Sequence, residues 1–201
     1  MRYTIKPKDL PNGHYELLRW VTLALSKDTT RGWLQALKVE PERLTACDGR
    51  RVHVAEQGIN PLILPVGFYS VLKSNTKELV LETYKPITAT GKYPSIARVM
   101  PDVKRMVMRK YSSYADRGGT AIAVIAGRNF DSRFLDDAAC GANVNKGMER
   151  LTATVYYSRE IDSTPVIFKT VDRWALIMPV IGTGMEHEEE EVKDMPTYEE
   201  Y

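Results

Sequence analysis

The order in which strand-like and helix-like segments follow one another constrains the fold of this chain most. Leu17, Leu18 and Val21 recur at intervals of three and four residues, which predicts an amphipathic helix. Asp48-Gly49 is a turn-forming pair between two alternating apolar segments, which is typical of a β-hairpin. The expected strands are 3–6, 33–39, 43–47 and 51–56, and the expected helix is 14–25. The first 56 residues therefore predict a β-α-β-β-β unit.

The same order is predicted to repeat along the chain. A second copy is expected with a strand at 62–65, a short helix at 66–74, strands at 78–82 and 86–89, and a closing segment at 96–100. A third copy is expected with a strand at 121–125, a helix at 131–142, and strands at 152–161, 165–170 and 174–180. Copies spaced by roughly fifty to sixty residues indicate an internal structural repeat. Antiparallel sheets with the helices on one face give an α+β fold class.

A basic segment separates the second and third copies. Val103, Met106 and Val107 fall at helical spacing, with Lys104 and Arg105 between them. The pattern predicts a helical linker over 102–120 that ends near a pair of glycines.

Composition excludes several function classes. No window holds eighteen consecutive apolar residues and the first residues lack the apolar core of a signal peptide, so we expect a cytoplasmic protein that does not enter a membrane. Cys47 and Cys140 are too few and too far apart for a disulfide framework or a zinc site, and the three histidines have no ligand-like spacing. We therefore expect no metal, no cofactor and no catalytic group. A nuclease using Asp136 and Asp137 is the weakest alternative, because adjacent helical side chains diverge.

The formal net charge of +2 hides an uneven distribution. Residues 185–201 hold eight acidic side chains and one lysine, a net charge of −7, so the rest of the chain carries +9. A basic body favours a polyanionic partner, and an acidic terminal segment can solubilise the chain or compete for the basic surface. We expect 184–201 to be a disordered acidic tail.

Four segments resemble motifs of one family, the bacterial sliding clamp, which is the beta subunit of DNA polymerase III. The segment 44–52, LTACDGRRV, resembles the family's ATDGHRL, and 30–36, TRGWLQA, resembles its VRxxLNG. The segment 92–101, KYPSIARVMP, resembles GRFPDYRRVLP, and 174–180, WALIMPV, resembles YVVMPM. The four motifs occur in the family's order and lie on the predicted repeats.

The resemblance implies a DNA-clamp fold, with antiparallel sheets outside and helices lining the inner face. It divides the chain into a complete clamp-like domain at 1–101, the linker at 102–120, a half domain at 121–183 and the tail at 184–201. Because the family chain has three domains of two halves each, this would be a shortened clamp of the kind that suits a phage or a mobile element.

The resemblance also implies a function as a processivity factor that encircles double-stranded DNA without reading its sequence. Phosphate attraction to basic side chains beside the helices would hold the duplex. The candidate DNA-binding residues are Arg19, Lys27, Lys73, Lys77, Arg128, Arg133 and Lys146.

A second implied site is a groove that receives short peptides from polymerases and the clamp loader. Apolar side chains would accept the peptide's anchors while Arg51 fixes its orientation. The matched groove residues are Cys47, Gly49, Arg51, Val52, Pro101, Leu176, Met178, Pro179 and Val180. Packing within the core is an equally good interpretation for Val52 and Leu176.

Ring closure would need several copies of the chain. A family ring has twelve lining helices, so three helices per chain would give a homo-tetramer with head-to-tail contacts. A clamp-fold adaptor that binds replication proteins without encircling DNA is the alternative function.

Overall fold

A computed structural model of the chain describes residues 1–11, 13–56, 64–85, 93–113, 122–125, 128–140, 151–157, 164–169 and 172–180. The strands are β1 (Arg2–Ile5), β2 (Ala36–Glu40), β3 (Arg43–Cys47), β4 (Arg51–Glu56), β5 (Gly67–Ser74), β6 (Leu79–Thr83), β7 (Val107–Ser113), β8 (Ile122–Ile125), β9 (Arg128–Asp131), β10 (Leu151–Tyr157), β11 (Val166–Lys169) and β12 (Arg173–Ile177). The helices are α1 (His14–Thr22), α2 (Ile96–Val99) and α3 (Ser132–Cys140).

The first predicted unit is confirmed. β1, α1, β2, β3 and β4 follow in the expected order, and the bounds of β3 and β4 are those read from the sequence. Gly13 precedes α1 with a φ of +83°, a left-handed conformation that glycine adopts without strain. α1 buries the expected apolar face, including Leu17, Leu18 and Val21.

The second unit differs from the prediction, because 66–74 forms a strand instead of a helix. β5 pairs antiparallel with β2 and β6, and β6 pairs with β1. Alternation explains the strand, since Tyr69 is buried in the core while Phe68 lies on the opposite face. The β5–β6 hairpin therefore adds two strands between β2 and β1. The expected strand at 86–89 lies outside the described residues.

The linker prediction is also wrong where the structure describes it. Residues 103–105 form a short 3-10 turn, and β7 then pairs along its whole length with β10. Val107 packs against the core while Met108 is exposed, so the alternation of a strand replaces the expected helical periodicity. β7, α3, β10, β11 and β12 thus make a second β-α-β-β-β unit, with the β8–β9 hairpin before α3. The domain boundaries expected at 101, 120 and 183 stay predictions.

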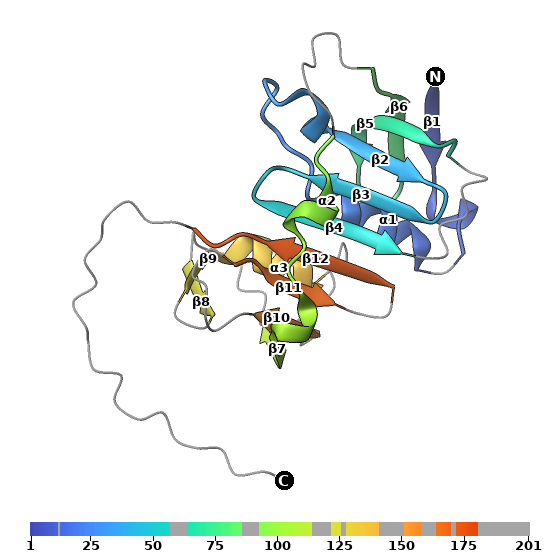
Figure 1. Ribbon diagram of the computed structural model, residues 1–201. Coiled ribbons are helices and arrows are strands. Elements are labelled where there is room, and N and C mark those ends of the chain that lie inside the picture. The colour runs from blue at the N-terminus through green and yellow to red at the C-terminus, as the bar shows by residue number, and fades with distance from the viewer. Residues whose placement is uncertain are drawn as a thin grey trace, which may run out of the picture.

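One ten-stranded antiparallel sheet joins the two units, in the order β1-β6-β5-β2-β3-β4-β12-β11-β10-β7. The last strands of the two units, β4 and β12, pair with each other in the middle part of the sheet. From this pair outward, the strands of each unit follow in reverse chain order, except that the β5–β6 hairpin is inserted between β2 and β1. α1 packs on β3, β4 and β5, and α3 packs on β7, β10 and β12 (Figure 1). We call the β4–β12 junction and the helix ends beside it the seam.

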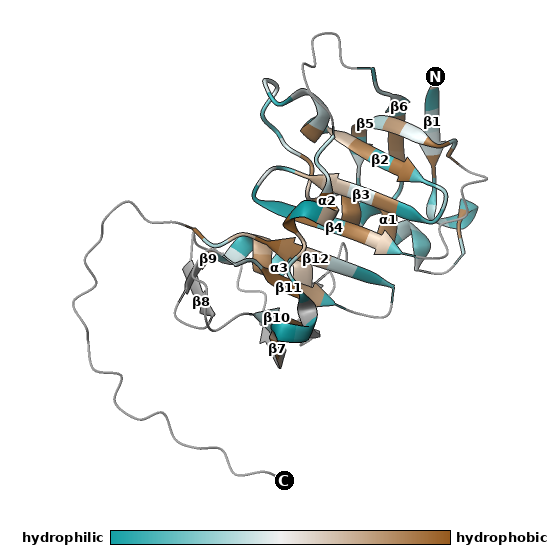
Figure 2. Ribbon diagram, in the orientation of Figure 1, coloured by the Kyte–Doolittle hydropathy of each residue, from teal (hydrophilic) through white to brown (hydrophobic). Residues whose placement is uncertain are grey.

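A single core extends through both units on the helix side of the sheet. Trp20 from α1, Leu135 from α3, Leu37 from β2 and Phe168 from β11 all belong to it and are almost fully buried. Much of β12 and the adjoining part of β4 is hydrophobic (brown in Figure 2). Burial of this continuous apolar surface holds the two units together.

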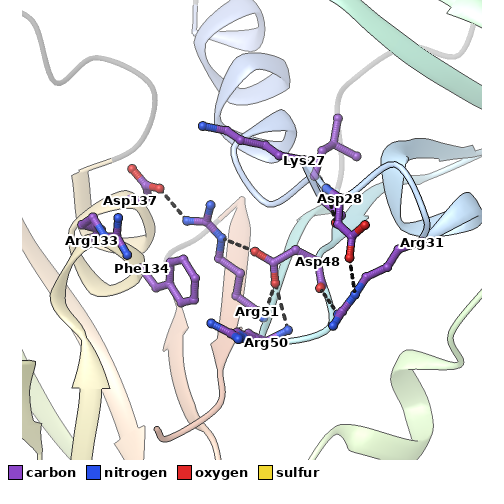
Figure 3. A pocket seen from close by; sticks show the side chains of 11 residues that line it. Lys27, Asp28, Arg31, Asp48, Arg50, Arg51, Arg133, Phe134 and Asp137 are labelled. Carbon is purple, nitrogen blue, oxygen red and sulfur yellow. Dashed lines mark hydrogen bonds and ion pairs between the residues drawn. The ribbon is translucent and has the colours of Figure 1, made fainter. Parts of the chain in front are cut away.

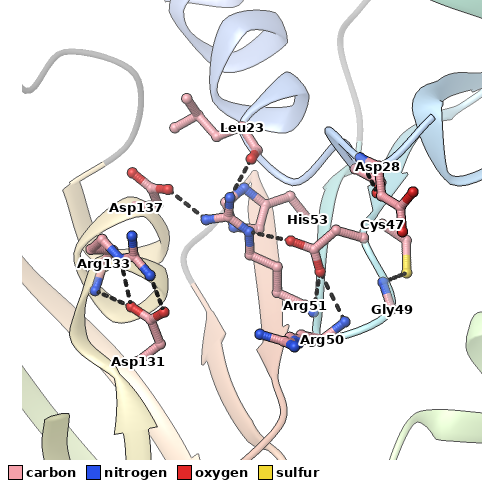
Figure 4. A network of polar contacts seen from close by, with 12 residues as sticks. Leu23, Asp28, Cys47, Gly49, Arg50, Arg51, His53, Asp131, Arg133 and Asp137 are labelled. Carbon is pink, nitrogen blue, oxygen red and sulfur yellow. Dashed lines mark hydrogen bonds and ion pairs between the residues drawn. The ribbon is translucent and has the colours of Figure 1, made fainter. Parts of the chain in front are cut away.

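Two side chains fasten the seam on the helix side. The indole of Trp20 donates a 2.7 Å hydrogen bond to the carbonyl oxygen of Asp137, which links α1 to α3. The guanidinium of Arg51 donates to the carboxylates of Asp48 and Asp137 and to the Leu23 carbonyl oxygen (Figure 4). It also lies 4.3 Å from the centroid of the Phe134 ring. Because Arg51 is only 9% exposed, its positive charge is stabilised by these partners instead of by water.

We expect Arg51→Ala to lower the free energy of unfolding by about 3 kcal/mol, because Asp48 and Asp137 would lose their buried cationic partner. Arg51→Lys should recover only part of this loss, since an ammonium cannot match the fork of a guanidinium. Chemical denaturation monitored by tryptophan fluorescence measures both. The neighbouring Arg50 is exposed, so Arg50→Ala is the matched control, and equal midpoints for the two alanine variants would contradict the assignment.

His53 is fully buried beside the same seam. Its ring stacks on Trp20 at a centroid distance of 4.4 Å, and Nδ1 lies 2.9 Å from the Trp20 carbonyl oxygen. Burial, together with the nearby positive charges of Arg51 and Arg173, lowers the pKa of His53 from 6.5 to about 3. The folded protein therefore keeps this imidazole neutral at any pH above that value.

Below about pH 6.5 the histidine of the unfolded chain takes up a proton, whereas the buried His53 of the folded protein does not. The free energy of unfolding should consequently fall as the pH is lowered through this range. The contribution of the neutral His53 to the free energy of unfolding is complete above about pH 6.5. About 2 kcal/mol of the free energy of unfolding should be lost between pH 7 and pH 5. Urea unfolding at several pH values measures this slope. The free energy of unfolding of His53→Gln should depend much less on pH over the same interval. An unchanged slope in this variant would show that other groups cause the pH dependence.

Candidate functional site

The seam presents an apolar cluster on the face of the sheet away from the core helices. Val52 and Val54 on β4 alternate with Arg51 and His53, so the two pairs face opposite sides. Val52 pairs with Leu176 on β12 and with Cys47 on β3. The buried members of this outer cluster are Cys47, Val52, Val54, Trp174 and Leu176, and Leu34, Ile96, Met100 and Met178 pack against them.

The segment 93–101, which includes α2, lies across this outer cluster (Figure 1). The Tyr93 hydroxyl donates a 3.2 Å hydrogen bond to the Thr45 carbonyl oxygen, and burial strongly raises the pKa of Tyr93. Its ring packs on Phe68 at 5.5 Å, while Ile96 and Met100 reach the cluster itself. The chain's own side chains therefore cover part of the expected groove.

The structure brings four of the nine expected groove residues together in the outer cluster. Cys47, Val52, Leu176 and Met178 come from the motifs at 44–52 and 174–180. Leu34 and Met100 bring the motifs at 30–36 and 92–101 to the same cluster. Burial raises the pKa of the Cys47 thiol, which keeps it protonated. Just beyond the end of β12, Pro179 is half-buried and Val180 is 46% exposed. Pro101 is half-buried and directly follows Met100, which packs on the cluster.

Two expected groove residues have a different placement. Arg51 faces the core helices, where it fastens the seam, so the role of orienting a peptide in the outer cluster does not fit its side chain. Gly49 lies in the β3–β4 turn with a φ of +90°, and a Cβ there would come within 2.7 Å of an Arg31 guanidinium nitrogen. The left-handed conformation of the turn therefore favours glycine at this position, whereas the flexible end of Arg31 could move aside for a Cβ.

A cleft of about 440 Å³ opens at the helix end of the seam (Figure 3). The loop after α1, the β3–β4 turn and α3 all contribute to it. Its lining residues are Leu25, Ser26, Lys27, Asp28, Arg31, Asp48, Arg50, Arg51, Arg133, Phe134 and Asp137. Five of these side chains are cationic and three are carboxylates, so the lining carries a net positive charge. We call it the seam cleft.

Ion pairs neutralise only part of this charge. Arg31 lies 3.3 Å from Asp28, and Arg51 pairs with Asp48 and Asp137. Arg133 makes two hydrogen bonds to the Asp131 carboxylate, which hold the pKa of Asp131 below its usual range. Within the described part of the chain, Lys27 and Arg50 pair with no carboxylate, and both are exposed.

The expected DNA-binding residues that the structure describes lie in four different parts of the fold. Lys27 and Arg133 meet in the seam cleft, and Arg19 is half-buried on α1. Lys73 and Lys77 lie on the β5–β6 hairpin instead of a helix, and Lys73 pairs with Glu78 at 2.7 Å. Arg128 begins β9, and Lys146 lies outside the described residues.

The two long helices themselves are close to neutral. The charges of Glu16 and Arg19 cancel on α1, and α3 holds Arg133 together with Asp136 and Asp137, which leaves a net charge of −1 for the pair of helices. The positive field of the described chain therefore comes from the loops at the seam cleft more than from the helices.

Sequence reasoning missed Arg31, Arg50 and Phe134 as lining residues. Arg31 and Arg50 belong to two of the quoted motifs, yet no local pattern indicates that these loops approach α3. No group of three or more His, Cys, Asp or Glu among the described residues is placed to hold a metal ion. The helices in the described ranges are all too short or too polar to cross a membrane.

Comparisons with known proteins identify the architecture. Neither the family models nor the curated proteins give a match. Among solved structures, the beta sliding clamp of C. crescentus is 16% identical with a TM-score of 0.54, and the alignment covers 90% of this chain. The sliding clamp of Bacillus subtilis is 15% identical with a TM-score of 0.45 over 91% of this chain.

This chain spans 65% of the length of each of these two clamps. At such low identity the likeness establishes the fold alone. Three observations agree with the expected fold class, which is therefore confirmed. They are the paired β-α-β-β-β units, the antiparallel sheet with both long helices on one face, and the C. crescentus alignment. This chain therefore has the DNA-clamp fold of the bacterial DNA polymerase III beta sliding clamps.

Proposed function

We propose that this protein is a sliding-clamp-type processivity factor that encircles duplex DNA and docks polymerase or clamp-loader peptides. The observation that carries the proposal is the convergence of separate motif segments at the seam of a clamp fold. The segments around 44–52, 92–101 and 174–180 are distant in the sequence, yet Cys47, Met100 and Met178 meet in one apolar cluster. The role needs no catalytic group.

The outer cluster supports peptide docking through its accessible rim. The strand residues are buried beneath Leu34, Ile96 and Met100, so a partner would contact the half-buried Met178 and the exposed Val180. Methionine and valine beside proline offer an adaptable apolar surface for differing anchors. Docking here would leave the opposite, helix-covered face of the sheet free for DNA.

The sheet also supports assembly of a ring. β1 and β7 are the edge strands of the ten-stranded sheet within the described residues, and each could pair with the other edge of a neighbouring copy. The tetramer was expected from three lining helices per chain, whereas α1 and α3 are the two long helices described. Three long helices are therefore not found within the described residues, and the mass of the assembly in solution decides the number of copies.

A loaded ring should be retained on closed circular DNA at moderate salt and should be lost after the circle is cut. Topological enclosure resists dissociation, whereas binding to phosphates alone weakens steeply with salt. Gel filtration of labelled protein on nicked circular and linearised plasmid, with a clamp loader supplied, measures the difference. Equal retention on the two forms would contradict encirclement.

We expect Val180→Asp to weaken the binding of a labelled clamp-binding peptide of a polymerase by roughly tenfold or more, because an apolar anchor would meet a charge. Fluorescence anisotropy measures the affinity. Leu72→Asp is the matched control, because Leu72 is 49% exposed on β5 and lies outside the outer cluster. Equal weakening by both substitutions would argue against docking at this rim.

A second candidate function is an adaptor that binds replication proteins without encircling DNA. The near-neutral charge of α1 and α3 favours it, since duplex DNA in a ring would face these helices. An adaptor would keep the peptide affinity while showing no difference between circular and linear DNA.

A further inference from the structure

Two cations of the seam cleft have no carboxylate partner among the residues that the structure describes. Lys27 follows α1 and Arg50 lies in the β3–β4 turn, and both are exposed (Figure 3). Asp28, Asp48 and Asp137 pair with Arg31 and Arg51, so they do not neutralise the other two cations. The cleft therefore presents two free positive charges beside a third, Arg133, that already binds Asp131.

The chain leaves β12 beside this cleft. The backbone N–H of Met178 donates a 2.8 Å hydrogen bond to the carbonyl oxygen of Arg50, one of the two free cations. The described chain ends two residues later, at Val180. Residues 186–191, with the sequence EHEEEE, begin six residues beyond Val180, a span of at most about 20 Å in an extended chain.

We propose that the seam cleft is a binding site for an acidic peptide segment and that its occupant is the chain's own residues 186–191. Five glutamates in that segment complement Lys27 and Arg50, and their carboxylates can form charge-assisted hydrogen bonds with the free donors. The short connection gives the segment an effective concentration on the order of millimolar, so even weak contacts keep it bound.

The same chain is the occupant, in preference to a second copy, because the connection from Val180 is short. Binding of the segment places negative charge at Lys27 and Arg133, which are also candidate contacts for DNA phosphates. Partners that carry phosphates must then displace it, so the segment regulates access to the seam. This consequence rests on the proposed function, whereas the binding of the segment does not.

Carbodiimide cross-linking of the full chain, without DNA or partner, tests the binding directly. The reagent joins a carboxylate to a lysine that contacts it, and mass spectrometry locates the bond. We expect bonds from residues 186–191 to Lys27 to exceed those to the exposed Lys8 and Lys85 several-fold, and this excess should disappear at high salt. An equal distribution among the three lysines would overturn the proposal.

Substitutions define the site further. Arg50→Glu should abolish the excess at Lys27, while Lys85→Glu, the same charge change outside the cleft, should preserve it. Mixing isotope-labelled and unlabelled protein distinguishes bonds within one chain from bonds between copies. A majority of bonds between copies would overturn the assignment to the same chain.

A peptide measurement provides a second readout. A labelled peptide of residues 185–201 should bind several-fold more tightly to a full chain in which the five glutamates of 186–191 are changed to glutamine, because the cleft is then vacant. Adding Arg50→Glu to that variant should remove the binding. Equal affinity for the wild-type chain and the glutamine variant would overturn the proposal. Neither readout uses DNA, so a failure of the clamp function leaves both results interpretable.

Discussion

The buried contacts of Arg51 hold the two halves of this fold in one arrangement. Its guanidinium reaches the end of α1 through the Leu23 carbonyl oxygen, α3 through Asp137, and the β3–β4 turn through Asp48. β4 and β12 also pair along the sheet, and the shared core and the Trp20–Asp137 hydrogen bond connect the same two units. Among these contacts, the three acceptors of Arg51 help to fix where α1 and α3 lie relative to each other, and with them the shape of the seam cleft.

The alternation of β4 then gives the seam two chemically different faces. Arg51 and His53 point toward the helices, and Val52 and Val54 point toward the outer cluster. A shift of one residue in the register with β12 would exchange these sets and bury Arg51 against Trp174 and Leu176. The register that satisfies Arg51 is thus the same register that assembles the apolar cluster, so the structural and the binding roles of the seam depend on each other.

The sequence predicted the elements that carry strong local signals. β3, β4 and α3 were located to within a few residues, because turn pairs, alternation and an amphipathic period mark them. The helices expected at 66–74 and, within the described part of 102–120, at 102–113 are wrong, because strand pairing with β2 and β10 outweighs the local helical spacing. The outer cluster was predictable through the motifs, whereas the direction of Arg51 and the approach of Arg31 to Gly49 depend on tertiary contacts that no local pattern encodes.

The fold places two unpaired positive charges of the described chain at the seam cleft. The helices, which the family resemblance would charge positively, sum to −1, while the loops around the seam cleft keep Lys27 and Arg50 unpaired in the described chain. The seam cleft therefore attracts polyanions, and it lies beside the point where the chain leaves β12 toward its acidic residues. A segment of opposite charge attached there competes for the cleft at a high effective concentration, so an external ligand needs a higher concentration or a higher affinity to replace it.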